Sequence, residues 1–172
     1  MSYRVIEKLN HGQRERLAFI DFCLQFYGQV SRADLIQHFQ TGPASCSRDL
    51  TLYRKLATDN LILKHQDKLY HRTTTFKPIF NHLTDIAFTH LINGFGDGVS
   101  TAPTQNEICF DAVRLIHPNS EIVATIVRTI KAGKALKCEY YSLSLGFTQR
   151  EIVPHAIINN GHRWHMRGFD RK

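Results

Sequence analysis

Near its end the chain alternates between cationic and apolar side chains. Arg163, His165 and Arg167 are separated by Trp164 and Met166. Successive side chains of a β-strand point to opposite faces of its sheet, so this alternation predicts a strand with one cationic face and one apolar face. The cationic face suits an anion or a nucleotide better than plain packing, because guanidinium groups bind phosphate oxygens through paired hydrogen bonds.

The β-patterned segment that precedes this strand carries further polar side chains. They are Tyr140, Ser142, Ser144, Arg150 and His155. Asn160-Gly161, between the two segments, is a strong signal for a type I′ hairpin turn, which would fix the register. Trp164 alternates in phase with Met166, opposite the arginines, which assigns it to the core. A structural salt-bridge network is the alternative role for these arginines.

The first third of the chain has helical periodicity instead. Residues 14–27 fit a mostly buried helix, which Gly28 would end. Ser31 is a good N-cap for a second helix, and Asp34 in its first turn complements the helix dipole.

A third helix is predicted over residues 43–57, and it is amphipathic. Residues 61–65 and 69–72 then have strand patterning, joined by a tight connection. Three short helices followed by a hairpin is the order of a winged helix-turn-helix, whose third helix enters the DNA major groove. The apolar face of the third helix consists of Cys46, Leu50, Tyr53 and Ala57.

The polar face of the third helix and the hairpin, as the wing, would supply the DNA contacts. The helix would reach base edges and phosphates, and the wing would touch backbone phosphates. The predicted DNA-binding residues are Ser45, Ser47, Arg48, Thr51, Arg54 and Lys55 of the helix, with Lys64, His65 and Lys68 of the wing. A winged helix used for protein contact is the alternative.

The middle of the chain is less informative. Residues 80–92 fit a short amphipathic helix, and residues 120–133 fit another one with Ser120 as its cap. The glycine cluster at 94–98 has no clear strand before it and no Lys-Ser or Lys-Thr pair after it, so a linker or surface loop is predicted. Residues 107–116 fit a strand or a helical turn.

Charge falls into three blocks. Of the net charge of +7, residues 1–80 carry +5, residues 81–130 carry −3 and residues 131–172 carry +5. Basic blocks are the expected footprint of a polyanionic partner, and a solvated surface without a partner is the alternative. No apolar run reaches the roughly 18 residues of a membrane span, and the N-terminal segment lacks a signal-peptide core.

No metal, cofactor or catalytic residue is expected. The four cysteines are spread singly without zinc spacing, which indicates reduced thiols in a cytoplasmic protein. His155 and His165 are the candidates for metal ligands or a general base. No carboxylate accompanies them in the motif, however, and Glu151 has a basic setting.

These segments resemble the WYL-domain transcriptional regulators, and within them the winged-helix repressors of bacterial phage-defence clusters of the BREX and CBASS kinds. The resemblance is carried by KAGKALKCEYYSLS, REIVPHAIINNGHRWHMRGFD and ASCSRDLTLY. It is strongest over residues 131–170 and moderate over 14–77. Trp164-His165-Met166 stands where the family has its Trp-Tyr-Leu tripeptide.

The resemblance implies an α+β chain in three parts. A winged helix-turn-helix would occupy residues 1–78, a helical linker 79–130, and an Sm-like or SH3-like WYL β-barrel 131–172. The family's barrel continues beyond the position of Lys172, so a partial barrel is expected here, with its open strand edge covered by another chain.

The resemblance also implies a ligand pocket on the barrel for a nucleotide or a nucleic-acid fragment. The residues that match by position are Tyr140, Ser142, Ser144, Arg150, His155, Arg163, His165 and Arg167.

Taken together, these features predict a ligand-responsive repressor of a phage-defence operon, bound to operator DNA as a homodimer. Half-sites would then be spaced in multiples of about 10 base pairs. Ligand binding would favour one of two dimer arrangements and so change operator affinity. The alternatives are a nucleotide-acting enzyme, with the C-terminal Arg/His set as its site, and an interaction adaptor that does not bind DNA.

Overall fold

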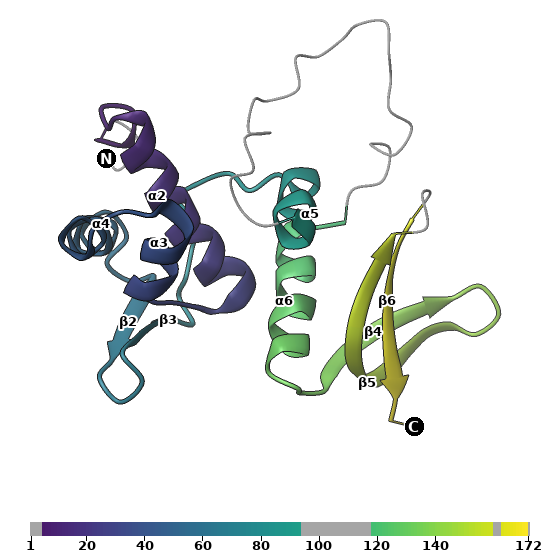
Figure 1. Cartoon of the computed structure of the whole chain (residues 1–172). Helices are drawn as coiled ribbons and strands as arrows, with labels where there is room; N and C mark the ends of the chain where they lie inside the picture. The colour runs from purple at the N-terminus through teal and green to yellow at the C-terminus, as the bar shows by residue number, and fades with distance from the viewer. Residues whose placement is uncertain (1–4, 94–117, 160–162, 172) are drawn as a thin grey trace, which may run out of the picture. The chain divides into compact units, whose positions relative to one another are not determined.

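The computed structural model describes residues 5–93, 118–159 and 163–171 (Figure 1). They belong to two compact units, one within residues 1–100 and one within 101–172. The glycine cluster at 94–98 and the ambiguous residues 107–116 lie outside the described residues. None of the helices in the described ranges is both long enough and apolar enough to span a bilayer.

The first unit contains the predicted three helices and hairpin. Its three-stranded antiparallel sheet has the order β1-β3-β2, which confirms the winged helix-turn-helix. Strand β1 was not anticipated, because two residues are too few to show a period. In chain order the elements are α2 (His11–Phe22), the π-helix η1 (Cys23–Tyr27), β1 (Gln29–Val30), α3 (Arg32–Phe39), α4 (Pro43–Leu56), β2 (Leu61–Lys64), β3 (Leu69–Arg72) and α5 (Thr84–Asn93).

The helix boundaries follow the capping signals of the sequence. Gly28 adopts φ 78° and ends the helical run after Tyr27. Glycine adopts such a left-handed conformation at the least steric cost. At the start of α3, the Ser31 hydroxyl accepts from the N–H of Asp34 (3.0 Å), and the Asp34 carboxylate accepts from the N–H of Ser31 (2.7 Å). This reciprocal capping box satisfies two donors that the helix itself leaves unpaired.

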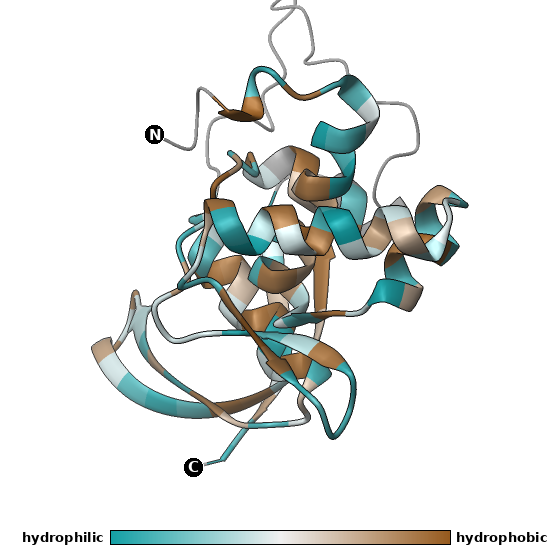
Figure 2. Cartoon of the chain, turned by 90° about the vertical axis from the view of Figure 1, so that its left-hand side faces the viewer, coloured by the Kyte–Doolittle hydropathy of each residue, from teal (hydrophilic) through white to brown (hydrophobic). Residues whose placement is uncertain are grey.

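Apolar side chains of α2, α3 and α4 fill the core of this unit, and hydrophobic and hydrophilic residues alternate along the helices of the chain (Figure 2). In α4 the apolar stripe is inside as predicted, because Cys46, Leu50 and Tyr53 are each at most 1% exposed. The other fully buried large side chains include Leu17, Ile20, Phe22, Leu24, Phe26, Val30 and Leu35.

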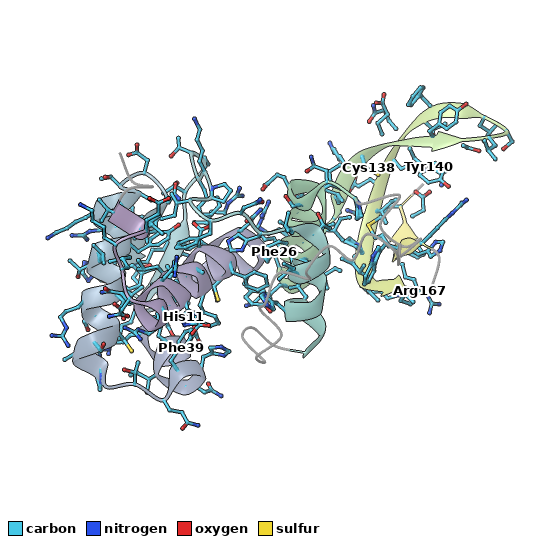
Figure 3. All side chains as sticks on the ribbon, turned by 90° about the horizontal axis from the view of Figure 1, so that it is seen from above. His11, Phe26, Phe39, Cys138, Tyr140 and Arg167 are labelled. Atoms are coloured by element: carbon cyan, nitrogen blue, oxygen red, sulfur yellow. The ribbon has the colours of Figure 1, made fainter. Side chains whose placement is uncertain are left out.

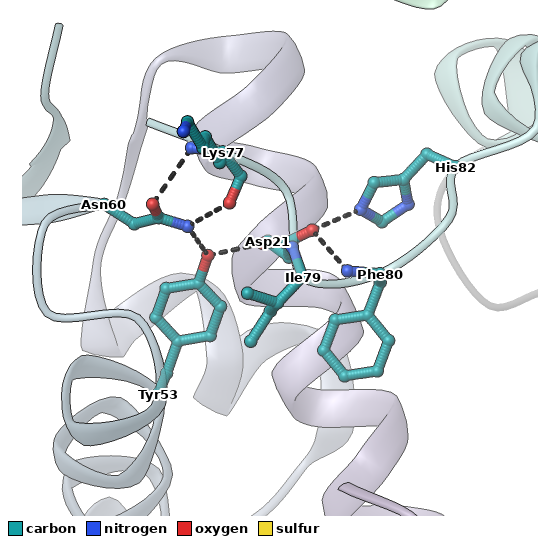
Figure 4. Close-up of polar contacts among 7 residues, drawn as sticks. All are labelled: Asp21, Tyr53, Asn60, Lys77, Ile79, Phe80 and His82. Carbon is teal, nitrogen blue, oxygen red and sulfur yellow. Dashed lines mark hydrogen bonds and ion pairs between the residues drawn. The ribbon is translucent and has the colours of Figure 1, made fainter. Parts of the chain in front are cut away.

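A buried carboxylate stands at the centre of this core. Asp21 of α2 is fully buried, and it accepts hydrogen bonds from the Tyr53 hydroxyl and from His82 Nε2 (2.9 Å) (Figure 4). The backbone N–H groups of Ile79 and Phe80 donate to the same carboxylate, each at 3.2 Å. A carboxylate is costly to bury unless it is paired and hydrogen-bonded, and four donors satisfy this one.

Where the structure describes the second unit, at residues 118–159 and 163–171, it contains one helix and one sheet. Helix α6 (Ser120–Lys131) precedes β4 (Leu136–Ser142), β5 (Gly146–Asn159) and β6 (Trp164–Asp170). The strands form an antiparallel sheet in the order β4-β5-β6. This sheet does not close on itself, which confirms the expected α+β fold with a partial barrel.

The N-cap of α6 was predicted one residue too late. Asn119, not Ser120, is the cap, and its side-chain oxygen accepts from the N–H groups of Glu121 (2.9 Å) and Ile122 (3.3 Å). Asparagine and serine are about equally good caps, so the sequence alone could not choose between two neighbours.

The register of β5 and β6 contains one irregularity. Pro154 pairs with Gly168 and Ala156 pairs with Arg167, so His155 is an extra residue in β5. At the other end Asn159 pairs with Trp164, whereas a two-residue turn at Asn160-Gly161 would pair Asn159 with His162. The turn residues themselves lie outside the described part of the chain.

Replacing Tyr53 with phenylalanine is expected to lower the free energy of unfolding by about 1–3 kcal/mol. The phenol donates to Asp21 and accepts from Asn60 Nδ2 (3.1 Å), so its loss leaves two buried polar groups each short of a partner. Urea unfolding followed by circular dichroism measures the change, and the slope against denaturant should stay constant.

Tyr70→Phe is the matched control. Tyr70 is half-buried on β3, and no hydrogen bond of its hydroxyl is found among the described residues. A change within about 0.5 kcal/mol is expected for it. Equal losses in the two variants would contradict the role given to the Asp21 network.

Candidate nucleic-acid interface and ligand face

The outer face of α4 is cationic and open. Arg48, Thr51, Arg54 and Lys55 are exposed, and Ser45 and Ser47 are half-exposed. The helix begins at Pro43, which suits a first turn because proline has no N–H to lose there. One face of α4 is therefore held in the core while the opposite face carries every predicted contact of this helix.

The hydroxyl groups on this face are already oriented. The Ser47 hydroxyl donates to the carbonyl of Pro43 (3.0 Å), and the Thr51 hydroxyl donates to the carbonyl of Ser47 (2.8 Å). Because a hydroxyl has one hydrogen and two lone pairs, these oxygens remain available as acceptors. In the major groove they would suit the exocyclic amino groups of adenine or cytosine.

The wing is a pre-formed turn. The Asp67 carboxylate accepts from the N–H of Leu69 (3.0 Å) and contacts His71 Nε2 (2.6 Å). The N–H of Leu69, and after it the His71 side chain, lowers the pKa of Asp67. Lys68 takes φ 58°, and the wing cations Lys64, His65 and Lys68 are all exposed.

A groove of about 570 Å³ lies between the wing and the helices, and it contains a cation that the sequence analysis missed. Arg32, the first residue of α3, is exposed, and its Nη1 donates to the Ser47 hydroxyl (3.4 Å). Arg32, His65 and Lys68 all line the groove, together with apolar side chains such as Leu50 and Leu63. In the sequence, the position of Arg32 directly after the predicted N-cap Ser31 indicates that this cation stands at the start of the second helix.

In the second unit the predicted ligand residues divide between the two faces of the sheet. Directly paired residues share a face, and alternate residues of a strand share it too. We call the face with Tyr140, Ser142 and Arg150 the Tyr140 face. The register also places Thr148, Cys138, Asp170, Trp164 and Met166 on it.

The Tyr140 face is organised around the Arg150 guanidinium. This group lies over the Tyr140 ring at 4.3 Å from its centroid. Its Nη1 is 3.1 Å from an Asp170 carboxylate oxygen. Arg150 thus already has a counter-charge and an aromatic neighbour, which leaves less positive charge for an anion than the sequence suggested.

The opposite side of the sheet, which we call the Arg167 face, carries His165 and Arg167, both exposed. Arg163 is also exposed and lies two residues before His165. Figure 3 labels Tyr140 and Cys138 on β4 and Arg167 on β6. As the alternation predicts, Trp164 and Met166 are more buried than the residues with which they alternate, but both are only half-buried, so the assignment of Trp164 to the core is not confirmed.

Two of the predicted residues stand at irregular positions. Ser144 is exposed in the turn between β4 and β5, where its hydroxyl lies 3.0 Å from that of Ser142. His155 is exposed at the bulge of β5. The eight predicted ligand residues therefore do not converge on one surface of the described sheet.

Neither unit assembles a metal site from its described residues. Across residues 5–93, 118–159 and 163–171, no three His, Cys, Asp or Glu side chains are grouped to hold an ion.

Comparison with known proteins agrees with both units. Residues 12–94 match the winged helix-turn-helix domain of BrxR transcriptional regulators, and residues 121–172 match the WYL domain.

Relatives named DNA-binding transcriptional repressor CapW match along most of the chain. The one from Stenotrophomonas maltophilia is 32% identical over 169 residues, which cover 94% of this chain and 56% of the relative. Those from Escherichia coli and Pseudomonas aeruginosa are 30% and 29% identical, with the same coverage. The chain spans about half the length of these curated relatives. The chain thus carries a BrxR-type winged helix-turn-helix domain followed by a WYL domain.

Proposed function

We propose that this chain binds operator DNA and represses transcription in response to a ligand. The observation that carries the proposal is the two-sided arrangement of α4. Its apolar side chains are locked in the core, while Arg48, Thr51, Arg54 and Lys55 face outward on the third helix of a winged helix. That geometry is the one with which such domains read the major groove.

The groove beside α4 supports the same interface. Arg32, His65 and Lys68 provide positive charge along it, and its apolar lining can receive the sugar of a DNA strand whose phosphates meet the cations. The Asp67 carboxylate lies in the groove as well, but it is engaged by His71 and by the backbone of Leu69. The CapW relatives are named as DNA-binding repressors and not as enzymes, which supports a regulatory rather than a catalytic role.

For the ligand we propose a nucleic-acid fragment whose parts are recognised by the two faces of the sheet separately. Arg163, His165 and Arg167 would bind phosphates through the Arg167 face. On the Tyr140 face the Arg150 charge is balanced by Asp170, so a planar, neutral base stacked on Tyr140 fits better than a phosphate. Ser142, Ser144 and His155 would add hydrogen bonds at the margins of these faces.

The remaining elements of the proposal concern assembly. We propose that the protein acts in the cytoplasm as a homodimer on a pseudo-palindromic operator of a phage-defence operon. In the described sheet β4 and β6 are edge strands, and an edge exposes unpaired backbone groups that another strand can pair with. If a second chain paired at one of these edges, the dimer interface would include the sheet that carries the proposed ligand residues. Ligand binding to that sheet would then affect the dimer. The boundaries at residues 78 and 130 remain predictions.

Replacing Arg48, Arg54 and Lys55 with alanine is expected to remove most duplex binding at physiological salt. Each phosphate contact that is lost should flatten the slope of log Kobs against log salt by about 0.9. Fluorescence anisotropy with a labelled duplex, repeated over a salt series, measures both quantities.

A variant with the same change in charge serves as the control. Lys8, Lys134 and Lys137 are exposed and lie outside the proposed interface. Their triple replacement by alanine should leave the salt slope close to that of the wild type. A similar slope in both triple variants would show that α4 does not face the duplex.

The two faces of the WYL sheet are expected to respond differently to substitution. Tyr140→Leu should weaken binding of a short mixed-sequence single strand by about 1–3 kcal/mol without changing its salt slope, because a stacked base is lost. Arg167→Ala should instead flatten the slope by about 0.7, because a phosphate contact is lost.

Isothermal titration of the full chain over a salt series distinguishes these effects. Gln149→Ala, an exposed and uncharged change on β5 that alters none of the proposed ligand residues, is the control for general perturbation of the sheet. If Tyr140→Leu and Arg167→Ala change affinity and slope in the same way, the division of labour between the faces is wrong.

A further inference from the structure

The recognition helix carries a buried carboxylate that the DNA interface does not use. Asp49 lies directly after Arg48 on α4, yet it is only 1% exposed. Arg16 Nε of α2 lies 2.6 Å from one of its oxygens, and Gln13 Nε2 donates to the other at 3.1 Å. A charged group therefore joins the inner face of α4 to α2.

A second polar link joins the same two helices one turn further along α4. Tyr53 stands four residues after Asp49, so the two side chains lie on the same face of the helix. Its hydroxyl donates to Asp21 of α2. The donor and acceptor roles of the two helices are reversed between the links. Helix α4 supplies the accepting carboxylate in the first link and the donating hydroxyl in the second.

Two such links constrain the helix more tightly than apolar packing does. Burial of apolar surface is non-directional, so it tolerates small rotations of α4 about its axis. Hydrogen bonds weaken steeply when their angles and distances change. Links at two successive turns therefore fix both the rotation of α4 and its position along α2.

We propose that Arg16 and Asp49 are positioning residues for sequence reading by α4. Their bond would hold the helix at the rotation that aims Thr51 and Arg48 at base edges. Neither residue would touch DNA, since the Arg16 side chain is 18% exposed and its Nε is bonded to Asp49. This inference rests on the proposed DNA-binding function and concerns its selectivity.

If the pair had a purely structural role, its replacement would leave the sequence selectivity of α4 unchanged as long as the domain stays folded. Replacing both members of a buried ion pair with apolar residues of similar size often leaves stability unchanged or raises it. The double variant Arg16→Met with Asp49→Leu therefore removes the directional bond without leaving an unpaired charge. Stability and selectivity can then be measured independently.

The experiment begins with selection of duplexes from a random library by the wild-type full chain. The affinity for the selected duplex is then divided by the affinity for a scrambled duplex. In the double variant this ratio is expected to fall by about tenfold or more, the order of losing one base-pair contact. Affinity for the scrambled duplex, and its salt slope, should not change, because the phosphate-binding cations remain.

Two further variants make the result decisive. Asp49→Asn, made alone, retains the shape of the side chain and one acceptor oxygen. Its ratio of selected to scrambled affinity should therefore lie between those of the wild type and the double variant. Val30→Ala opens the core at β1 without touching either polar link, and it should lower the unfolding midpoint while the ratio stays at the wild-type value.

An unchanged ratio in the double variant would overturn the positioning proposal, as would an equal fall in Val30→Ala. If the wild-type chain selects no sequence at all, the proposed function itself fails and the positioning proposal falls with it. Selection by the wild type together with an unchanged ratio in the double variant removes only the positioning proposal.

Discussion

The buried carboxylate of Asp21 is the interaction on which the winged-helix unit depends. It receives hydrogen bonds from Tyr53 on α4, from His82, and from two backbone N–H groups of the chain that follows the wing. Burial of this charge is tolerable only while all of these partners are in place. Asp21 therefore joins α2, α4 and the exit from the wing into one arrangement, and the outward face of α4 can be presented to a partner only from that arrangement.

Helix α4, the proposed DNA-reading helix, is held by polar contacts on its inner side and carries cations on its outer side. Asn60 extends the rear network by bonding the Tyr53 hydroxyl together with the backbone N–H and carbonyl of Lys77. Burial raises the pKa of the Tyr53 phenol, so this group stays a donor toward Asp21 throughout the working range of pH. In the proposed interface the outer side would need no comparable network, because exposed cations act on phosphates through charge and tolerate mobility. Rigidity and charge are thus divided between the two sides of one helix.

The sheet of the WYL unit shows how far local patterns predict a site. The alternation of β6 was interpreted correctly, since Trp164 and Met166 are more buried than His165 and Arg167. A single pocket lined by all eight polar residues is not what the strands build. Arg150 and Arg167 lie on opposite faces. Asp170, whose carboxylate forms an ion pair with Arg150, shares the face of Arg150 and stands three residues after Arg167 on the same strand, so Arg167 points to the other face. Which residues of different strands share a face depends on register and on the extra residue His155, and neither is visible in a local pattern.

The sequence by itself determined the order of the helices, their caps at Ser31 and Gly28, the buried stripe of α4 and the open cationic face opposite it. These features depend on periodicity and on neighbours within one helical turn, so they can be read along the chain. Only the tertiary structure decided that Asp49 would meet Arg16, 33 residues away, and that Asp21 would meet His82, 61 residues away. It alone also placed Arg32 beside the wing and divided the polar residues of the sheet between two faces. Such pairings form when distant segments are brought together, and the identity of each partner is a property of the packed chain.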